Sequence, residues 1–599
     1  MNNQNCEKRD FKKTRGIFIR LCGYVLTYWY LFFPAVIFTL FSNQLALLGP
    51  KYSGIAIDAL SLINVDFDVV WENVIKMIVC YVISAITSYL LSAIMIFMSQ
   101  KISYTLRKQL FEKLTSLPVG YFDIHPTGDI ISHISYDVDT VNNSLSHDLV
   151  QIMTSAYTVI GSLVFMWNIS KPLIAVFLIT IPISILFTRF RTLKVKPLFR
   201  LRSKKLGELN GYAEEMLSGC RSIQAYSRQE EISGRFNKRN TSSMDAYYEA
   251  DYHGCVMGPT MNFINNLSIS LVMILGGILY MLSQSGVAKA GSVLFITLGG
   301  VAQFVQYSRK FAGPINEFAN ILTELQSAFS AAERIFDILD ESPETPDIEN
   351  AKVLQNPKGK VEFKDVVFGY TQDKIILKGI DFSALEGKTV AIVGPTGAGK
   401  TTIINLLMRF YDTNKGIIEV DDTDSTLYTR ASLRKAYTMV LQDTWIFAGT
   451  VFDNIAYGKD NATMDEVVAA AKAAKIHTYI ESLPDGYNTL LTDDGVNISK
   501  GQRQLITIAR AIISKSNMLI LDEATSNVDS RTEIKIQEAM NELMKGKTCF
   551  VIAHRLSTIQ NADVILVLQN GVITEQGNHK ELLQLKGFYS TLYNSQFVE

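Results

Sequence analysis

The sequence predicts a bundle of membrane-spanning helices followed by an α/β domain, and three observations carry this prediction. Apolar segments of bilayer-spanning length recur through roughly the first 320 of the 599 residues. The composition then turns polar, with many turn-forming residues, over residues 340–360. A β-rich run at 389–393 leads into a glycine-rich loop and then a helix. A chain of this length holds two or three domains rather than one.

Six apolar segments are long enough to cross a bilayer as helices. They are residues 29–49, 74–98, 149–169, 171–189, 260–283 and 291–308. Little more than Ser170–Lys171–Pro172 separates the third segment from the fourth. We expect a tight turn there, because one continuous helix would far exceed the bilayer thickness. The prediction is a cytosolic N-terminal elbow segment at 1–28 and a six-helix transmembrane domain with long cytosolic loops at 29–325.

The distribution of lysine and arginine indicates the orientation in the membrane. Both are frequent in the N-terminal stretch, in residues 99–148 and in residues 190–258, whereas the first connection, at 58–72, is acidic. Because basic loops stay in the cytosol, we expect the N terminus, both long loops and everything after the last span there. The expected location is therefore a plasma membrane, crossed several times. Apolar residues at three- to four-residue spacing predict that the long loops are helical rods whose tips receive force from another domain.

Polar side chains inside the apolar segments have two readings. They are Asn43, Gln44, Asn262, Asn265, Asn266, Gln303 and Gln306. Most are expected to form interhelical hydrogen bonds, because amides in lipid seek partners. A minority are candidates for lining a polar or amphipathic cavity, and the sequence does not separate the two.

Composition gives little support for other classes of protein. The formal net charge of −1 offers no argument for nucleic acid as a partner, and none is expected. The six cysteines are scattered, with no CxxC pair and no metal-binding spacing, and we expect free thiols. No short cleavable signal peptide is evident at the N terminus.

A glycine-rich loop gives the second half its chemistry. A linker at 326–358 precedes a domain at 359–599, in which GPTGAGKT follows the strand and opens a helix. The loop glycines let backbone N–H groups turn toward phosphates, and the helix N-terminus favours their negative charge. Lys400 is expected to reach the β and γ phosphates, and the Thr401 hydroxyl to bind Mg²⁺. The predicted loop residues are Gly394, Pro395, Thr396, Gly397, Ala398, Gly399, Lys400, Thr401 and Thr402.

A carboxylate pair ends a later apolar strand, MLILDE. Asp522 is expected to hold Mg²⁺ through water, and Glu523 to polarise a water molecule for in-line attack on a phosphate. Such a pair is a weak signal alone. Downstream of a phosphate-binding loop it becomes a strong one.

The order of motifs resembles that of ATP-binding cassette (ABC) transporters. The motifs are GPTGAGKT, VLQDTWIF, NISKGQ, MLILDEATS, SNVD and VIAHRLSTI. The membrane half, which ends in SAAERIFDILDESPE, resembles the exporter branch, in which six helices precede one cassette. The resemblance covers almost the whole chain. It implies an exporter-type membrane domain fused to an α/β P-loop NTPase domain of ABC type, with ATP and Mg²⁺ as its cofactors.

The resemblance also implies roles for residues that are uninformative alone. Tyr370 matches the aromatic residue that stacks on adenine, and Gln442 the glutamine that contacts Mg²⁺ and the attacking water. His554 matches the histidine that contacts the γ-phosphate, and Asp529 matches an aspartate that crosses between two cassettes. The implied catalytic set is Glu523, His554 and Gln442, and the implied metal set is Thr401, Gln442 and Asp522.

The resemblance implies how the two halves communicate. Residues 116–125 and 215–226 resemble the two coupling helices, which lie at the tips of the cytosolic loops. Trp445 and Phe447 are expected to line the groove on the cassette into which such tips press.

The motif NISKGQ resembles the family's signature sequence, LSGGQ, which closes over ATP held by a partner cassette. Ser499, Gly501 and Gln502 match the common pattern, whereas Ile498 and Lys500 depart from it. A second half-transporter is therefore the expected partner. In one exporter subgroup, a subunit with the catalytic glutamate and an altered signature pairs with an unlike subunit, and this chain resembles that first kind. Tolerated variation in a homodimer is the alternative.

The expected function is ATP-driven export of an amphipathic small molecule, lipid or peptide by alternating access, through one half of a dimeric transporter. The transported substrate is not readable from the sequence. The alternatives are a homodimeric lipid flippase or drug exporter, and an ATP-gated channel or regulatory subunit.

Overall fold

The computed structural model describes residues 3–61, 65–288, 292–371, 374–441, 444–492, 498–522, 529–552 and 559–597. Among these, only the backbone is described for residues 3–14, 315–320, 322 and 595–597. The chain forms two compact units. Unit 1 holds residues 1–115 and 127–341, and unit 2 holds residues 116–126 and 342–599.

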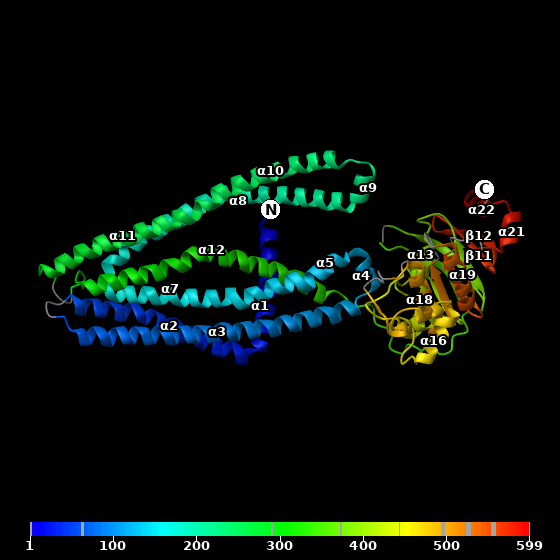
Figure 1. The fold of residues 1–599 in the computed structure, drawn as a ribbon, viewed down its shortest axis with the longest axis horizontal. Helices are drawn as coiled ribbons and strands as arrows, with labels where there is room; N and C mark the ends of the chain where they lie inside the picture. Colours follow the sequence, from blue (N-terminus) through cyan, green and yellow to red (C-terminus); the bar gives the residue numbers. More distant parts are fainter. Residues whose placement is uncertain are drawn as a thin grey trace. The chain divides into compact units, whose positions relative to one another are not determined.

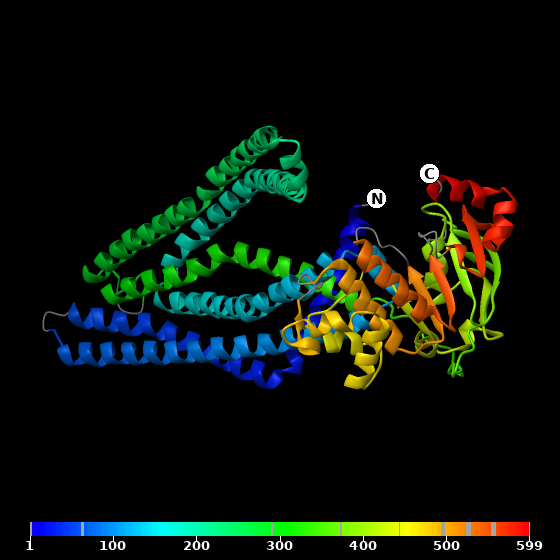
Figure 2. The ribbon, with the colours of Figure 1, turned by 45° about the vertical axis from the view of Figure 1, so that its right-hand side comes forward.

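Unit 1 is entirely helical in the part of the chain that is described (Figure 1). Its helices are α1 (Asn3–Thr27), α2 (Trp29–Leu60), α3 (Phe67–Ser116), α5 (Thr127–Ser132), η1 (His133–Asp137), α6 (Val138–Asn143), η2 (Ser144–Asp148), α7 (Leu149–Ile169), α8 (Lys171–Ser218), α9 (Cys220–Ala225), α10 (Gln229–Cys255), α11 (Met257–Gln284) and α12 (Leu298–Asp340). In both ribbon views α8, α10 and α11 form an arm that diverges from α7 and α12 toward its α9 tip (Figures 1 and 2).

The predicted spans correspond to the long helices. Within the described residues, five helical stretches are long and apolar enough to cross a membrane, and α12 follows them as a further long helix. The third and fourth spans meet at Ser170, whose extended backbone breaks α7 from α8. The long loops between the predicted spans are largely helical extensions of them, as the apolar spacing predicts.

The start of the last span differs from the prediction. We expected helix from residue 291, but α12 begins at Leu298. Thr297 is the N-cap residue, and its hydroxyl oxygen accepts the Gly300 N–H at 3.0 Å. The same hydroxyl donates to Asp58 at 2.8 Å, which fixes the helix start against the end of α2. A side chain that satisfies the first-turn N–H groups outweighs apolar composition in setting a helix boundary.

The polar residues of the spans divide as the two readings allowed. Gln44 accepts a hydrogen bond from Tyr157 at 2.7 Å, and Asn43 accepts one from Thr158 at 3.2 Å. Gln303 and Gln306 donate to the Lys51 carbonyl and the Ser53 hydroxyl, at 3.1 and 3.0 Å. These four join helices, which confirms the interhelical reading for them. Asn262 and Asn265, by contrast, line cavities.

Unit 2 is an α/β domain built on two main sheets. The strands are β1 (Val361–Phe368), β2 (Leu377–Ala384), β3 (Thr389–Val393), β4 (Lys415–Val420), β5 (Thr423–Asp424), β6 (Tyr437–Val440), β7 (Gly449–Thr450), β8 (Leu490–Leu491), β9 (Met518–Asp522), β10 (Thr548–Ile552), β11 (Val564–Gln569) and β12 (Val572–Gly577). An antiparallel sheet has the order β2-β1-β4-β5, and a six-stranded sheet has the order β12-β11-β3-β10-β9-β6.

The helices of unit 2 cover the six-stranded sheet. They are α4 (Val119–Ile124), α13 (Lys400–Leu407), η3 (Ser425–Leu427), α14 (Arg430–Ala436), α15 (Val451–Ala456), α16 (Met464–Ala473), α17 (His477–Glu481), η4 (Gly486–Asn488), α18 (Lys500–Ile513), α19 (Ser530–Met544), α21 (His579–Gln584) and α22 (Phe588–Phe597). The strands β9 and β10 alternate their side chains between two hydrophobic clusters, one on each face of the sheet. Parallel strands buried on both faces explain the continuous apolar runs of the sequence.

Candidate nucleotide site

The predicted site loops leave one edge of the parallel sheet. Strands β11, β3, β10, β9 and β6 pair in parallel, with β10 between β3 and β9. Because parallel strands share the direction of their carboxyl ends, the segments after β3 and β9 emerge on the same edge of the sheet. The glycine-rich loop follows β3, and Asp522 is the last residue of β9. The fold therefore brings these two motifs, which are far apart in the sequence, to neighbouring strand ends.

The loop after β3 depends on glycine at its turns. Gly394, Gly397 and Gly399 have φ angles of 155°, 82° and 107°. A Cβ atom at Gly394 would lie 2.2 Å from the Leu568 carbonyl oxygen, so a side chain does not fit there. At Gly397 a Cβ atom would meet nothing within 4 Å, and only the backbone conformation requires glycine. The loop is thus a tight backbone turn with open space at its centre.

Helix α13 begins without a side-chain cap. Its N-cap residue is Gly399 in the left-handed region, and no side chain accepts its first N–H groups. By contrast, capping boxes close the starts of α15, α16, α18 and α21, and Thr429 and Asp529 cap α14 and α19. The N–H groups at a helix start have no intrahelical partners and attract anions. The start of α13 therefore fits a phosphate group.

Lys400 supplies a positive charge at this helix start. Its Nζ atom donates to the carbonyl oxygens of Gly394 and Pro395, at 2.8 and 3.1 Å, so the ammonium group is held over its own loop. Burial lowers the pKa of Lys400, and the negative charge of Asp522 partly offsets that effect. A partly buried cation beside open N–H groups suits the multiply charged end of a nucleotide.

The two threonines after Lys400 have different surroundings. Thr402 is buried, and its hydroxyl lies 3.2 Å from the Tyr370 hydroxyl, to which Asn405 also donates at 3.1 Å. Thr401 is exposed at the start of α13. Hydroxyl and carboxylate oxygens are ligands that Mg²⁺ prefers, so Thr401 and Asp522 fit the predicted metal role by their chemistry.

Tyr370 lies within an aromatic cluster. Its ring packs edge-on against Phe368 and Tyr411, with centroid distances of 5.1 and 5.0 Å, and the residue is 46% exposed. The hydroxyl is held by Thr402 and Asn405, so the ring has a fixed position on the side of the loop. An exposed, immobilised aromatic face is suited to stacking on a base.

Tyr411 connects this cluster to the short helix α4. Its hydroxyl donates to Asp123, and the Cβ position of Gly120 lies 3.0 Å from its ring. Burial and the Asp123 carboxylate both raise the pKa of Tyr411, so it stays a neutral donor. The sequence analysis missed Tyr411, because its partner lies 288 residues earlier and no local pattern marks the pair.

Ser499 opens α18 with a reciprocal cap. Its hydroxyl oxygen accepts the Gln502 N–H at 3.3 Å, and its own N–H donates to the Gln502 side chain at 2.8 Å. Gly501 is buried in the first turn, and Lys500 is exposed. Within the described ranges, no hydrogen bond joins Ser499, Gly501 or Gln502 to residues 394–402. The structure brings the phosphate loop and Asp522 together, and it leaves the signature residues with their own helix.

Other predicted residues lie outside the described ranges or have structural partners. Gln442, Glu523 and His554 fall outside the described residues. Asp529 accepts the Thr532 N–H at 2.9 Å as the N-cap residue of α19, which lowers its pKa.

An aromatic patch surrounds Arg510 elsewhere in unit 2. The guanidinium group lies 5.4–5.9 Å from the rings of Trp445, Phe447 and Tyr457, and it donates to the Asn454 and Trp445 carbonyls at 2.7 and 3.1 Å. Trp445 and Tyr457 are exposed. The sequence analysis identified two of the rings, but it missed Arg510 and Tyr457, which are the centre and the third wall of the patch.

Fold and site together define a class of protein: a multi-span membrane protein with a P-loop nucleotide-binding domain. Comparison with known families is more specific. The family model described as ABC transporter transmembrane region matches residues 31–301. The family model described as ABC transporter matches residues 377–526. The chain belongs to the ABC transporter family, and its ATP-binding domain implies ATP hydrolysis coupled to transport.

Individual relatives agree with this assignment. An uncharacterized ABC transporter ATP-binding protein of Bacillus subtilis, YfiC, is 40% identical over 98% of this chain and 95% of its own length. A fatty acid ABC transporter ATP-binding/permease protein of Mycobacterium bovis is 41% identical over 88% of this chain and 81% of its own. An ATP-dependent lipid A-core flippase of Mannheimia succiniciproducens is 36% identical over 87% and 88%. The structure of a bacterial Atm1-family ABC exporter with ATP bound covers 95% of this chain and 98% of its own, with 28% identity and a TM-score of 0.75.

Proposed function

We propose that this chain is one half of an ATP-driven exporter that moves an amphipathic, lipid-like molecule out of the cell by alternating access. The observation that carries the proposal is the start of α13. An uncapped helix with Lys400 over it lies at the sheet edge that also ends in Asp522, in a chain that carries an exporter-type membrane unit. A nucleotide-binding domain fused to membrane spans is suited to driving transport in one direction.

The cassette residues act on ATP in distinct ways. The N–H groups of α13 and the Lys400 ammonium orient the phosphates, and the Tyr370 ring holds the base. Thr401, Asp522 and Gln442 would hold Mg²⁺, which would neutralise part of the charge on the phosphates. Glu523 withdraws a proton from the attacking water, and His554 steadies the γ-phosphate. These roles rest on the family resemblance and on the geometry of the loop.

We assign a second, unlike half-transporter as the partner. ATP would be held between the phosphate loop of one cassette and the signature helix of the other. Ile498 is buried in the hydrophobic core, so its departure from leucine conserves the packing. Lys500 is exposed at the first position of α18, so its departure falls where phosphate would approach. A chain that has Glu523 together with an altered signature sequence favours the heterodimer.

ATP that makes additional contacts only in the closed pair shifts the transporter toward that state by the difference in affinity. Closure would move the coupling helices and open the cavity outward, and hydrolysis would reset the dimer. The cassettes and the N terminus are assigned to the cytosolic side of the plasma membrane, which the basic inner loops support.

The substrate class rests on two lines of support. Two of the relatives are named for fatty acid and for lipid A-core transport. A cavity of about 1070 Å³ in unit 1 has mostly apolar walls. A molecule with a long apolar part suits both.

Cysteine cross-linking tests the assembly. Thr396→Cys and Ser499→Cys are introduced together, with the six natural cysteines replaced, and the membrane protein is oxidised with ATP and Mg²⁺. We expect no disulfide-linked dimer of this chain when it is expressed alone, and cross-linking only to an unlike subunit carrying the matching cysteine. An efficient homodimeric disulfide would contradict the heterodimer.

The variant Glu523→Gln tests ATP hydrolysis separately from the assembly of the transporter. We expect ATP hydrolysis to fall on the order of 100-fold or more, with ATP binding retained, because the change removes the base and keeps the shape. The readouts are phosphate release and equilibrium binding of labelled ATP. Normal turnover in this variant would remove Glu523 as the base.

A further inference from the structure

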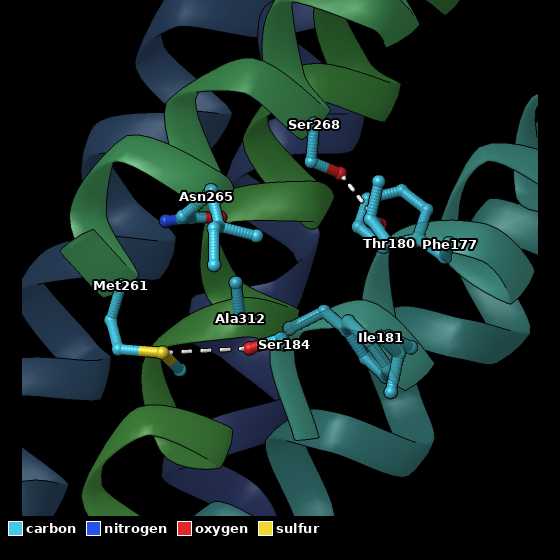
Figure 3. A pocket seen from close by; sticks show the side chains of 10 residues that line it. Phe177, Thr180, Ile181, Ser184, Met261, Asn265, Ser268 and Ala312 are labelled. Carbon is cyan, nitrogen blue, oxygen red and sulfur yellow. Dashed lines mark hydrogen bonds between the residues drawn. The ribbon is translucent and has the colours of Figure 1, made fainter. Parts of the chain in front are cut away.

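Three cavities follow one another along α8. The largest, of about 1070 Å³, is lined by residues of α7, α8, α11 and α12. A crevice of about 40 Å³ shares Ser184 and Met261 with it (Figure 3). A third cavity, of about 580 Å³, shares Thr192 and Met257 with the largest. Shared walls make the three a continuous groove within unit 1.

The part of this groove toward Phe177, called the upper part, has mostly apolar walls, with a stripe of hydroxyls on α8 and the amides of Asn262 and Asn265 on α11. Its apolar walls include Ile152, Ala156, Val159, Ile160, Ile185 and Leu193. The stripe consists of hydroxyl residues at four-residue spacing on one face of α8: Thr180, Ser184, Thr188 and Thr192. The hydroxyls of Thr180, Ser184 and Thr188 have local partners.

Figure 3 shows two of these local partners in the crevice. The Thr180 and Ser268 hydroxyls lie 3.1 Å apart, and Ser184 donates to the Met261 sulfur at 3.7 Å. With its hydroxyls partnered in this way, the upper groove suits an apolar chain better than a polar ligand.

Positive charge is concentrated in the part of the groove toward Arg200, called the lower part. Arg189 lines the large cavity, and Lys196 and Arg200 line the next one. No Asp or Glu is among the described residues that line any of the three cavities. Among the described lining residues, the charge at this end of the groove is therefore all positive.

The neighbouring arginines of α8 are used differently. Arg191 donates to the His253 carbonyl at 3.1 Å, and Arg202 forms an ion pair with Asp251 at 2.7 Å, so both hold α8 to α10. Over the described side chains, no such bond engages Arg189, Lys196 or Arg200. These three side chains are exposed and line the cavities, so an anionic ligand could reach all of them.

We propose that this groove binds a single-chain lipid with a carboxylate headgroup, a long-chain fatty acid. The carboxylate lies at Arg189, with Lys196 and Arg200 on its path from the cytosolic end, and the acyl chain lies along the apolar walls toward Phe177. The proposal rests on the proposed export function and names its substrate class.

The dimensions of the groove agree with this occupant. From Arg189 to Phe177 the helix rises about 18 Å, which is slightly more than half the ~30 Å hydrocarbon core and so about one acyl chain. The large cavity lies at the upper end of the size range of small-molecule sites. A cationic amphiphile would meet three like charges, and a neutral one would leave them without an anion.

Binding of three matched 18-carbon probes tests the proposal. Labelled oleate, oleyl alcohol and oleylamine share the chain and differ in headgroup charge. Their binding is measured without ATP to the full-length Glu523→Gln protein, with its partner subunit, in nanodiscs of zwitterionic lipid. We expect oleate to bind about tenfold more tightly than the alcohol, and oleylamine to bind most weakly.

Variants of α8 assign the preference to the groove. Arg189→Gln should reduce the preference for oleate over the alcohol to about twofold or less, and Arg189→Lys should keep most of it. Lys194→Gln is the matched control, because Lys194 is an exposed cation of the same helix whose ammonium lies 4.7 Å from the Phe190 ring centroid, outside the cavities. Thermal unfolding midpoints report whether each variant is folded.

Each outcome decides the inference. Equal binding of oleate and the alcohol, or the same loss in Lys194→Gln as in Arg189→Gln, would overturn it. Because binding is read without hydrolysis, a protein that selects oleate but does not move it would contradict only the export proposal. A protein that exports some other amphiphile without preferring oleate would contradict only the fatty-acid assignment.

Discussion

Two helices of the α/β unit begin in motifs that we expect to contact phosphate, and their first turns are built differently. α13 starts at Gly399, with no side-chain cap, beneath the Lys400 ammonium. α18 starts at Ser499, whose hydroxyl and N–H are both engaged by Gln502. The first turn of α13 has no side-chain partner for its N–H groups, whereas the Gln502 N–H in the first turn of α18 already has one. The Ser499 hydroxyl still has its own proton to donate.

This difference suggests a division of labour. The binding energy for the triphosphate would come mainly from the α13 start of one cassette. The α18 start of another would add a weak contact that exists only when two cassettes close. A weak contact made in one state alone is what shifts a conformational equilibrium.

The largest effect is expected at Lys400. Lys400→Ala should lower kcat/KM for ATP on the order of 100-fold or more, because it removes the charge held over the uncapped helix start. Phosphate release and labelled-ATP binding measure the change. Lys435→Ala is the control, since its side chain is 81% exposed and, among the described residues, only a 4.0 Å contact to Asp460 engages it. If both variants behaved alike, the α13 start would not be the phosphate site.

The glycines of the loop are expected to differ from one another. Gly394→Ala should destabilise the cassette by about 3 kcal/mol, because its Cβ atom would lie 2.2 Å from the Leu568 carbonyl oxygen and its φ is positive. Gly397→Ala should cost about 1 kcal/mol, because only the positive φ opposes it. The shift in the thermal unfolding midpoint measures both. Equal shifts would show that strain, rather than the close approach, dominates.

The sequence predicts the α13 site better than the rest of the molecule. The loop is readable because its glycines, Lys400 and the flanking strand and helix are contiguous, and the helix start they form is a local structure. The span boundary at Ser170 is readable because two adjacent apolar runs exceed one bilayer. Both predictions depend on interactions between residues that are close together in the sequence.

Long-range contacts are the part that the sequence does not predict. The Tyr411 hydroxyl and Asp123 are far apart in the chain, and no period or spacing relates them. The start of α12 was misplaced because Asp58, at the end of another helix, helps to fix Thr297. Similarly, Arg189 and Arg191 look equivalent in sequence, and only the packing of α10 decides which one faces the cavity.

The N-cap of α18 allows a matched test of the weaker contact with ATP that we expect at the start of this helix. Ser499→Ala should cost about 1 kcal/mol of stability, the usual loss for a helix cap. Thr463→Ala removes an equivalent capping box, with Glu466, from α16 and should cost about the same. Only the Ser499 variant should also weaken binding of labelled ATP at the site that Ser499 closes, by about tenfold, in the assembled transporter. A similar loss of ATP binding in Thr463→Ala would assign the effect to stability alone.

The smallest effect is expected at the exposed lysine of α18. Lys500→Gly gives the signature the common second glycine at a first-turn position, where the cost in helix stability is below about 1 kcal/mol. In the proposed heterodimer the site closed by Ser499 is slow because the unlike partner lacks a catalytic glutamate. The variant should therefore change the ATPase rate of the assembled transporter by no more than about twofold, on the scale of a single weak contact.

A large increase in the rate of Lys500→Gly would reverse this argument. It would show that Lys500 itself limits closure over ATP, and that the uncharged partner groups of α18 were sufficient once the side chain was removed. The heterodimer would then lose its main support, because the altered signature would be a regulator of a competent site rather than the mark of an incompetent one.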